Sequence, residues 1–190
     1  MKETEVLKVG GVILYPTDTV WGLGCDATNE ESIKRIIEIK GGDSGKNLLI
    51  LVKDEDMLKD YVEHIPEKAL DVLRTAIQPT TIIYPKAKNL PIHLLSSNES
   101  IGIRIPNHDF CQRLLSEYGK PIVSTSANTS GKPTPLCFSQ IESRILEAVD
   151  YVSLCEREEK IESKASSIIL IDQDNNLKQM NKDKKWLDSE

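Results

Sequence analysis

Hydroxyl and amide side chains gather in one short stretch of this chain. Residues 124–133 read Ser-Thr-Ser-Ala-Asn-Thr-Ser-Gly-Lys-Pro and directly follow Lys120–Val123, which predicts a short apolar strand. Ligands of α/β proteins bind beyond the carboxyl ends of strands, where backbone N–H groups and short polar side chains converge. In an extended chain Ser126 and Asn128 would project to one side. The stretch therefore suits a phosphate or carboxylate, although the same residue types also make ordinary turns.

A glycine-rich loop with two lysines is the second candidate. Residues 40–46 read Lys-Gly-Gly-Asp-Ser-Gly-Lys. This is not a P-loop, because Lys40 stands at the first glycine position, Asn47 replaces the Ser/Thr that binds magnesium, and the loop follows a helix. Lys40 and Lys46 could still hold a polyanion as point charges. The alternative is a solvated turn.

Three further side chains could recognise an anion. Thr17 and Thr19 follow a predicted strand and flank Asp18, and Arg104 is the one charged residue on the polar face of the strand 101–105. An arginine inside a sheet needs an anionic partner, which is either a protein carboxylate or a substrate carboxylate.

The histidines and serines give no sign of other chemistry. The three histidines show no metal-ligand spacing and no nucleophile partner, so we interpret them as surface or capping residues: His64, His93 and His108. We nominate no metal ligands. The motif Gly-x-Ser-x-Gly of Ser-His-Asp hydrolases is absent.

Strand-like and helix-like segments alternate along the chain and would position these residues. Apolar runs predict strands over residues 11–15, 48–52, 80–84, 101–105, 120–123, 151–154 and 167–171. Helical spacing and capping signals predict helices over 28–40, 66–77, 107–118 and 139–149, with capping boxes at 28–31 and 139–142 and with Leu70, Leu73 and Ile77 facing inward. We expect one α/β domain, residues 1–172, with a mixed and mainly buried sheet, followed by a polar tail, residues 173–190.

Composition excludes several classes of protein. The 190 residues contain no apolar run near the roughly 18 residues of a membrane span, and the acidic N-terminus lacks a signal-peptide core. Four scattered cysteines indicate neither a zinc site nor a disulfide framework and favour a cytoplasmic location. A net charge of −6 argues against broad nucleic-acid binding, although a local basic patch could survive it.

An ordered series of motifs resembles the YrdC/Sua5/TsaC family, in its short, single-domain form. The opening signature is Pro-Thr-Asp-Thr-Val-Trp-Gly-Leu-Gly-Cys-Asp-Ala at residues 16–27. The resemblance continues through Lys40 and Lys46, residues 79–81, residues 102–108 and the stretch 124–133, and it ends near residues 166–169. It covers about 160 of the 190 residues in the family's order and spacing.

The resemblance implies a fold and a reaction. The fold would be a twisted, mixed, open sheet flanked by helices, with a concave cleft lined by basic residues. The activity would be that of an L-threonylcarbamoyladenylate synthase, a nucleotidyltransferase that converts L-threonine, bicarbonate and ATP, with Mg²⁺, into threonylcarbamoyl-AMP and pyrophosphate. Partner proteins of the t6A pathway would then pass the threonylcarbamoyl group to adenosine 37 of tRNA.

Roles are implied residue by residue. The catalytic and ATP-binding group would be Lys40, Lys46, Ser126 and Asn128, with Thr134 also on the nucleotide side. The L-threonine group would be Thr17, Thr19, Arg104, Ser124 and Ser166, with Arg104 on the carboxylate.

The chain also departs from the family's pattern. The Lys-x-Arg motif reads Lys40-Gly41-Gly42 here, so glycine replaces an arginine that would bind phosphate. A second hypothesis therefore stays open. The chain could be a paralogue that binds double-stranded RNA, a property attributed to this family, or a nucleotide, without synthase activity.

Overall fold

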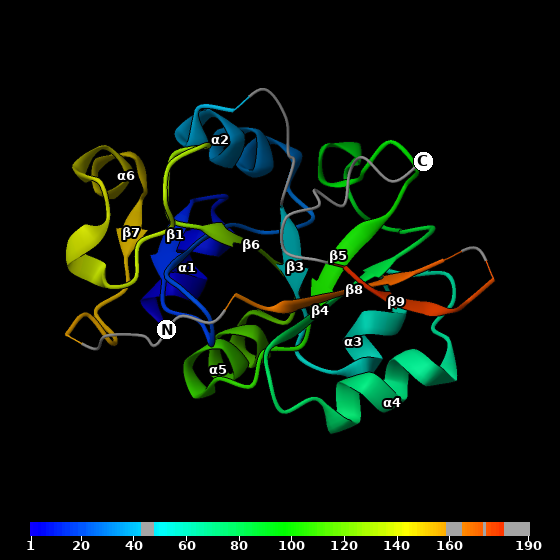
Figure 1. Ribbon diagram of the computed structural model, residues 1–190. Helices are drawn as coiled ribbons and strands as arrows, with labels where there is room; N and C mark the ends of the chain where they lie inside the picture. Colours follow the sequence, from blue (N-terminus) through cyan, green and yellow to red (C-terminus); the bar gives the residue numbers. More distant parts are fainter. Residues whose placement is uncertain (43–47, 159–164, 173, 181–190) are drawn as a thin grey trace.

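A mixed sheet organises the protein in a computed structural model that describes residues 1–42, 48–158, 165–172 and 174–180 (Figure 1). Within these residues nine strands lie in the order β7-β1-β2-β6-β3-β5-β4-β8-β9. The strands are β1 Ile13–Tyr15, β2 Gly22–Gly24, β3 Leu49–Leu51, β4 Thr80–Tyr84, β5 Ile101–Arg104, β6 Ile122–Ser126, β7 Tyr151–Val152, β8 Ser167–Ile171 and β9 Leu177–Gln179. The helices are α1 Lys2–Lys8, α2 Glu30–Lys40, α3 Glu55–Lys59, α4 Glu67–Thr75, α5 Asp109–Tyr118 and α6 Ser143–Ala148, with 3₁₀ turns at Ile92–Leu94 and Phe138–Gln140.

Strand directions confirm the expectation of a mixed sheet. The pairs β1–β7, β3–β5 and β4–β8 are parallel, and the other five neighbouring pairs are antiparallel. Helices cover both faces of the sheet (Figure 1). The α/β class and the flanking helices are therefore as predicted.

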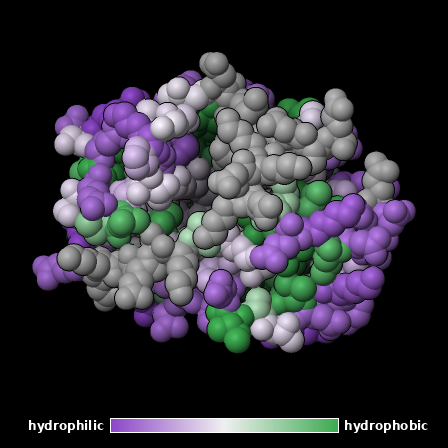
Figure 2. All heavy atoms as spheres, in the orientation of Figure 1, coloured by the Kyte–Doolittle hydropathy of each residue, from purple (hydrophilic) through white to green (hydrophobic). Residues whose placement is uncertain are grey.

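Two apolar cores lie on opposite faces of the β1 region. Leu14 packs in the larger core with the α2 isoleucines, whereas Ile13 and Tyr15 pack in the smaller core with Phe110 of α5. This division follows from the strand, because successive side chains point to opposite faces. Figure 2 shows one face of the molecule, on which hydrophilic residues predominate and hydrophobic residues form small patches. No helix among the described residues has the length and apolar character needed to cross a membrane.

Glycines end two helices where the sequence predicted. Gly41 follows α2 with φ 65° and Gly119 follows α5 with φ 76°, a left-handed conformation that side chains with a Cβ avoid. The start of α2 differs by one residue from the predicted capping box. Asn29 is the N-cap, and its side chain accepts a hydrogen bond from the Ser32 N–H. Thr28 instead donates its hydroxyl to Asp26.

Two predictions about helices were wrong. Ile77 is 98% exposed, because α4 ends at Thr75 and the chain leaves the helical direction before reaching it. No helix starts at Ser139, where the second capping box was predicted. A 3₁₀ turn occupies residues 138–140, and α6 starts at Ser143 with Glu142 as its N-cap.

The sheet continues beyond residue 172, where a polar tail was expected to start. Strand β9 pairs antiparallel with β8, and the turn between them is held by Asp172 Oδ1, which accepts from the backbone N–H groups of Asp174 and Asn176. The sequence did not predict this strand, because residues 177–179 do not alternate between apolar and polar side chains. The strand lies at the edge of the sheet, where most of its side chains face solvent. Residues 181–190 of the expected tail lie outside the described part.

Candidate functional site

A tight hydroxyl-rich turn follows β1. Thr17 and Thr19 are buried, and their hydroxyl oxygens lie 3.0 Å apart. Thr17 Oγ1 donates to the Val20 carbonyl at 2.7 Å and accepts from the backbone N–H groups of Thr19 and Val20. Because its hydroxyl is bonded to the backbone of the same turn, Thr17 fixes the direction in which the intervening residue, Asp18, projects.

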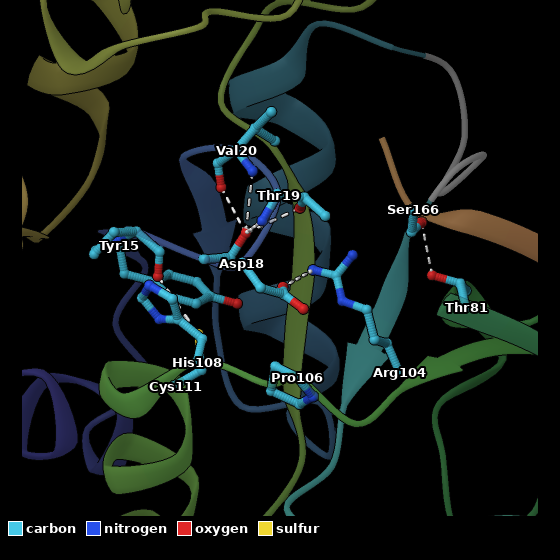
Figure 3. Close-up of polar contacts among 12 residues, drawn as sticks. Tyr15, Asp18, Thr19, Val20, Thr81, Arg104, Pro106, His108, Cys111 and Ser166 are labelled. Atoms are coloured by element: carbon cyan, nitrogen blue, oxygen red, sulfur yellow. Dashed lines mark hydrogen bonds and ion pairs between the residues drawn. The ribbon is translucent and has the colours of Figure 1, made fainter. Parts of the chain in front are cut away.

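Asp18 projects toward Arg104, at the end of β5. Arg104 Nη2 lies 3.2 Å from Asp18 Oδ1, and both side chains are almost fully buried, with 4% and 6% exposure (Figure 3). Neither Asp18 oxygen accepts a hydrogen bond with good geometry from any described residue, and Arg104 Nε also lacks a partner among them. The anionic partner expected for the buried Arg104 is thus the carboxylate of Asp18. Both side chains of this pair can still form further hydrogen bonds.

Neutral groups and a His–Glu pair lie beside these charges. Burial raises the pKa values of the Tyr15 hydroxyl and the Cys111 thiol well above their ordinary values, so both remain protonated at neutral pH. His108 Nε2 lies 3.1 Å from Glu156 Oε2, and His108 Nδ1 is buried with no described partner. His108 stands at the N-cap position of α5, but its side chain caps no N–H group, so the structure does not confirm the interpretation of His108 as a capping residue.

Two hydroxyls lie on the other side of Arg104. Thr81 Oγ1 donates to Ser166 Oγ at 2.9 Å, and Figure 3 shows Arg104 between this pair and Asp18. The arrangement follows from the sheet, because β4 pairs with both β5 and β8. The structure thereby brings the predicted residues Arg104 and Ser166 to one region.

Two predicted residues, Thr17 and Ser124, lie beside Gly22. A Cβ built on Gly22 would lie 3.4 Å from Ser124 Oγ and 3.4 Å from Thr17 Cγ2, so both side chains surround this glycine. Gly22 itself pairs with Ser126 in the β2–β6 ladder. The segment 17–22 therefore connects the buried charge pair to the end of β6, where the hydroxyl- and amide-rich stretch lies.

The side chain of Lys40 hydrogen-bonds to the backbone of this hydroxyl- and amide-rich stretch. Its Nζ donates to the carbonyl oxygens of Ser126 at 2.6 Å and Asn128 at 2.9 Å, across more than eighty residues of sequence. Burial lowers the pKa of Lys40 to about 8, so the ammonium group is charged at neutral pH. A second link lies beside it, because the Ser130 N–H donates to the Lys40 carbonyl at 2.8 Å.

Near Asn128, one side-chain acceptor has no described partner, and the backbone at Gly42 lies close to the Ser130 side chain. Asn128 Nδ2 donates to the carbonyls of Thr129 and Lys132, whereas its Oδ1 is buried with no described partner. A Cβ built on Gly42 would lie 2.7 Å from Ser130 Oγ. Gly42 therefore lies directly against Ser130, and a larger residue at position 42 would require the Ser130 hydroxyl to move.

Two predicted residues do not join these contacts. Thr134 is exposed and hydrogen-bonds to no described residue, and Lys46 lies outside the described residues. The main feature that the sequence missed is the use of Asp18. Its position between two threonines was visible, but strand register alone does not show which carboxylate reaches Arg104. No group of three or more His, Cys, Asp or Glu side chains that could hold a metal occurs in the described ranges.

Comparison with known proteins connects this geometry to a family. Residues 5–180 match the Sua5/YciO/YrdC family, which carries the description "Telomere recombination". The chain is 38% identical over 148 residues to a threonylcarbamoyl-AMP synthase of Pseudoalteromonas translucida, covering 76% of this chain and 79% of the relative. It is 34% identical over 144 residues to the enzyme of that name from Vibrio vulnificus, covering 74% and 77%.

Solved structures agree with this fold. P. abyssi Sua5, described as complexed with L-threonine, superposes with a TM-score of 0.81 at 27% identity and over 89% of this chain. This chain spans about half of that protein, 49% of its length. E. coli YciO superposes with a TM-score of 0.77 at 28% identity, covering 91% of this chain and 84% of the other.

Proposed function

This chain belongs to the Sua5/YciO/YrdC family, and from that premise we propose that it is an L-threonylcarbamoyladenylate synthase. It would use L-threonine, bicarbonate and ATP to make threonylcarbamoyl-AMP and pyrophosphate. The curated relatives named as this enzyme match most of the chain at 34–38% identity, which favours the synthase over a binding-only paralogue. The net charge of −6 also speaks against double-stranded RNA as the main ligand.

The observation that carries this proposal is the buried Arg104 with an unsatisfied guanidinium N–H. A carboxylate is the natural ligand for such a group, because guanidinium and carboxylate form charge-assisted hydrogen bonds. The hydroxyls of Thr17, Thr19, Ser124 and Ser166 lie around the same region and supply neutral donors and acceptors. These five residues would hold L-threonine.

The nucleotide would bind on the other side of Gly22, at the end of β6. The ammonium group of Lys40 has three N–H donors, of which two bind backbone carbonyls, and the third could donate to a phosphate. Ser126, the open Oδ1 of Asn128 and Thr134 would complete this side, together with Lys46. Magnesium would arrive bound to the ATP phosphates, which commonly supply its ligands in nucleotide sites.

The reaction is an adenylyl transfer, in which positioning and charge neutralisation dominate. After the α-ammonium group of L-threonine has lost a proton to solvent, the amine combines with bicarbonate to give a carbamate, and water is released. An oxygen of the carbamate then forms a bond to the α-phosphorus of ATP while the bond from that phosphorus to pyrophosphate breaks. Lys40 would balance phosphate charge, and Arg104 would fix the carboxylate. No protein nucleophile is required.

The later steps belong to the same proposal. The threonylcarbamoyl-adenylate would be passed to partner proteins of the t6A pathway, which modify adenosine 37 of tRNA. Direct contact with tRNA or double-stranded RNA is not needed for the synthase step. The cytoplasm is the proposed location, because ATP and tRNA are found there.

Pyrophosphate release from ATP, measured with magnesium and bicarbonate, tests the proposal. Release should require L-threonine, and mass spectrometry should detect threonylcarbamoyl-AMP. Arg104→Ala and Lys40→Ala should abolish both signals. Lys34→Ala is the matched control, because Lys34 lies on the same helix as Lys40 but forms only exposed ion pairs with Glu30 and Glu31.

Two outcomes would contradict the synthase. One is pyrophosphate release that does not depend on L-threonine. The other is a folded protein that binds RNA with a steep salt dependence and turns over no ATP, which would favour the paralogue and make Gly42 the decisive difference.

A further inference from the structure

The Asp18–Arg104 pair is incompletely satisfied, and this is its most informative property. Both side chains are more than nine-tenths buried, yet a single 3.2 Å approach of Arg104 Nη2 to Asp18 Oδ1 joins them. Both Asp18 oxygens and Arg104 Nε lack a well-oriented hydrogen bond within the described residues. Buried charges are normally paired and hydrogen-bonded, because desolvation of an ion is costly. A buried pair with capacity left on both partners indicates a ligand that contacts both.

The surroundings restrict the chemistry of that ligand. Tyr15 and Cys111 stay neutral, and the nearby Thr17, Thr19, Thr81 and Ser166 side chains are neutral hydroxyls already engaged in hydrogen bonds. Among the charged side chains, the unused hydrogen-bonding capacity is thus an anionic acceptor on Asp18 and a cationic donor on Arg104, and His108 Nδ1 beside them also has no described partner. The complementary ligand carries a cation and an anion a few bond lengths apart, as the zwitterion of an α-amino acid does.

We propose that Asp18 binds the α-ammonium group of the amino-acid substrate while Arg104 binds its α-carboxylate. This inference rests on the proposed function for the identity of the amino acid, L-threonine. It adds a specificity residue: Asp18 would select ligands that have an α-amino group over hydroxy acids of the same shape. The turn fixed by Thr17 holds Asp18 in the required direction.

A different use of the same contact makes the opposite prediction. If Asp18 only occupied Arg104 until a substrate carboxylate displaced it, removal of the Asp18 charge would strengthen binding of every carboxylate. With ammonium recognition, removal weakens amino acids alone. The two uses are therefore separated by the sign of the effect on L-threonine.

Isothermal titration calorimetry of the full chain with two ligands provides the test. The ligands are L-threonine and 3-hydroxybutanoate, which keeps the carboxylate and the hydroxyl but lacks the ammonium group. Wild-type protein should prefer L-threonine by about ten- to hundredfold, the ratio expected for one hydrogen-bonded charge contact. Asp18→Asn, which is isosteric, should lose that preference by weakening L-threonine alone, and its affinity for 3-hydroxybutanoate should stay equal or rise.

The outcomes distinguish this inference from the proposed function. If wild-type protein binds no L-threonine, the proposed function fails and the inference falls with it. If wild-type protein binds L-threonine but Asp18→Asn binds it as tightly or more tightly, only the role of Asp18 is overturned. If Asp18→Asn does not fold, as judged by its thermal unfolding curve, the wild-type preference decides: equal affinity for the two ligands overturns the inference.

Discussion

Replacement of Arg104 by methionine should strongly destabilise the protein even when no substrate is present. Methionine fills much of the same space but leaves the Asp18 carboxylate buried with no cation, since Arg104 is its one charged contact in the described residues. Breaking a buried ion pair from one side costs about 3–5 kcal/mol. Total stability of a domain is about 5–15 kcal/mol, so the loss remains measurable.

Urea unfolding of a double-mutant cycle would measure this effect. Arg104→Met with Asp18→Asn removes both charges, so the double variant should be more stable than Arg104→Met alone. Arg74→Met is the control, because Arg74 forms an ion pair with Glu55 at a site where both partners are substantially exposed, and its loss should change little. A cost for Arg104→Met no larger than that of the control, with no coupling to Asp18, would refute the reasoning.

Two further predictions concern Lys40 and Gly24. Burial lowers the pKa of Lys40 to about 8, so its ammonium group deprotonates as the pH rises through that value. The affinity for ATP, measured by calorimetry, should therefore weaken from about pH 7 to about pH 9 in the wild type but much less in Lys40→Arg. Equal weakening in both proteins would exclude Lys40 as the cause. Gly24→Ala should destabilise the protein by about 1–3 kcal/mol in urea unfolding, because the new Cβ would lie 2.5 Å from Tyr15 Cε1 and 2.8 Å from the Val123 carbonyl oxygen. Gly22→Ala is its comparison, with contacts of 3.4 Å or more, and it should cost less.

Local pattern was enough to predict the strand that carries Arg104 and the helix that carries Lys40, whereas β6, which was expected to end at Val123, continues to Ser126. The alternation of Ile101 and Ile103 with Arg104 gives the strand and its polar face, and Gly41 gives the end of the helix that carries Lys40. These signals are short-range, so a sequence displays them directly.

Long-range geometry explains what the sequence did not predict. Strand β2 reads Gly-Leu-Gly, which has low strand propensity, and Gly24 in it allows Tyr15 and Val123 to approach closely. The Asp18–Arg104 contact joins residues 86 positions apart, and nothing local in either segment encodes it. Lys40 was expected to be a free phosphate ligand, and its hydrogen bonds to two carbonyls were not predicted, because they too join residues that are far apart in the sequence.

Lys40 is hydrogen-bonded to the β6 stretch, which is the hydroxyl- and amide-rich segment 124–133, and this link affects unequally which substitutions the protein can accept at its two ends. Its acceptors are the main-chain carbonyls of Ser126 and Asn128, which every amino acid possesses. Side chains at those two positions could be exchanged, and ligand preference altered, while the link persists. At the other end the link depends on one long cationic side chain, so no substitution in the β6 stretch could restore what a change at Lys40 removes. The two hydrogen bonds themselves should therefore survive a change of side chain at residues 126 and 128, whereas they should not survive loss of the cation at position 40.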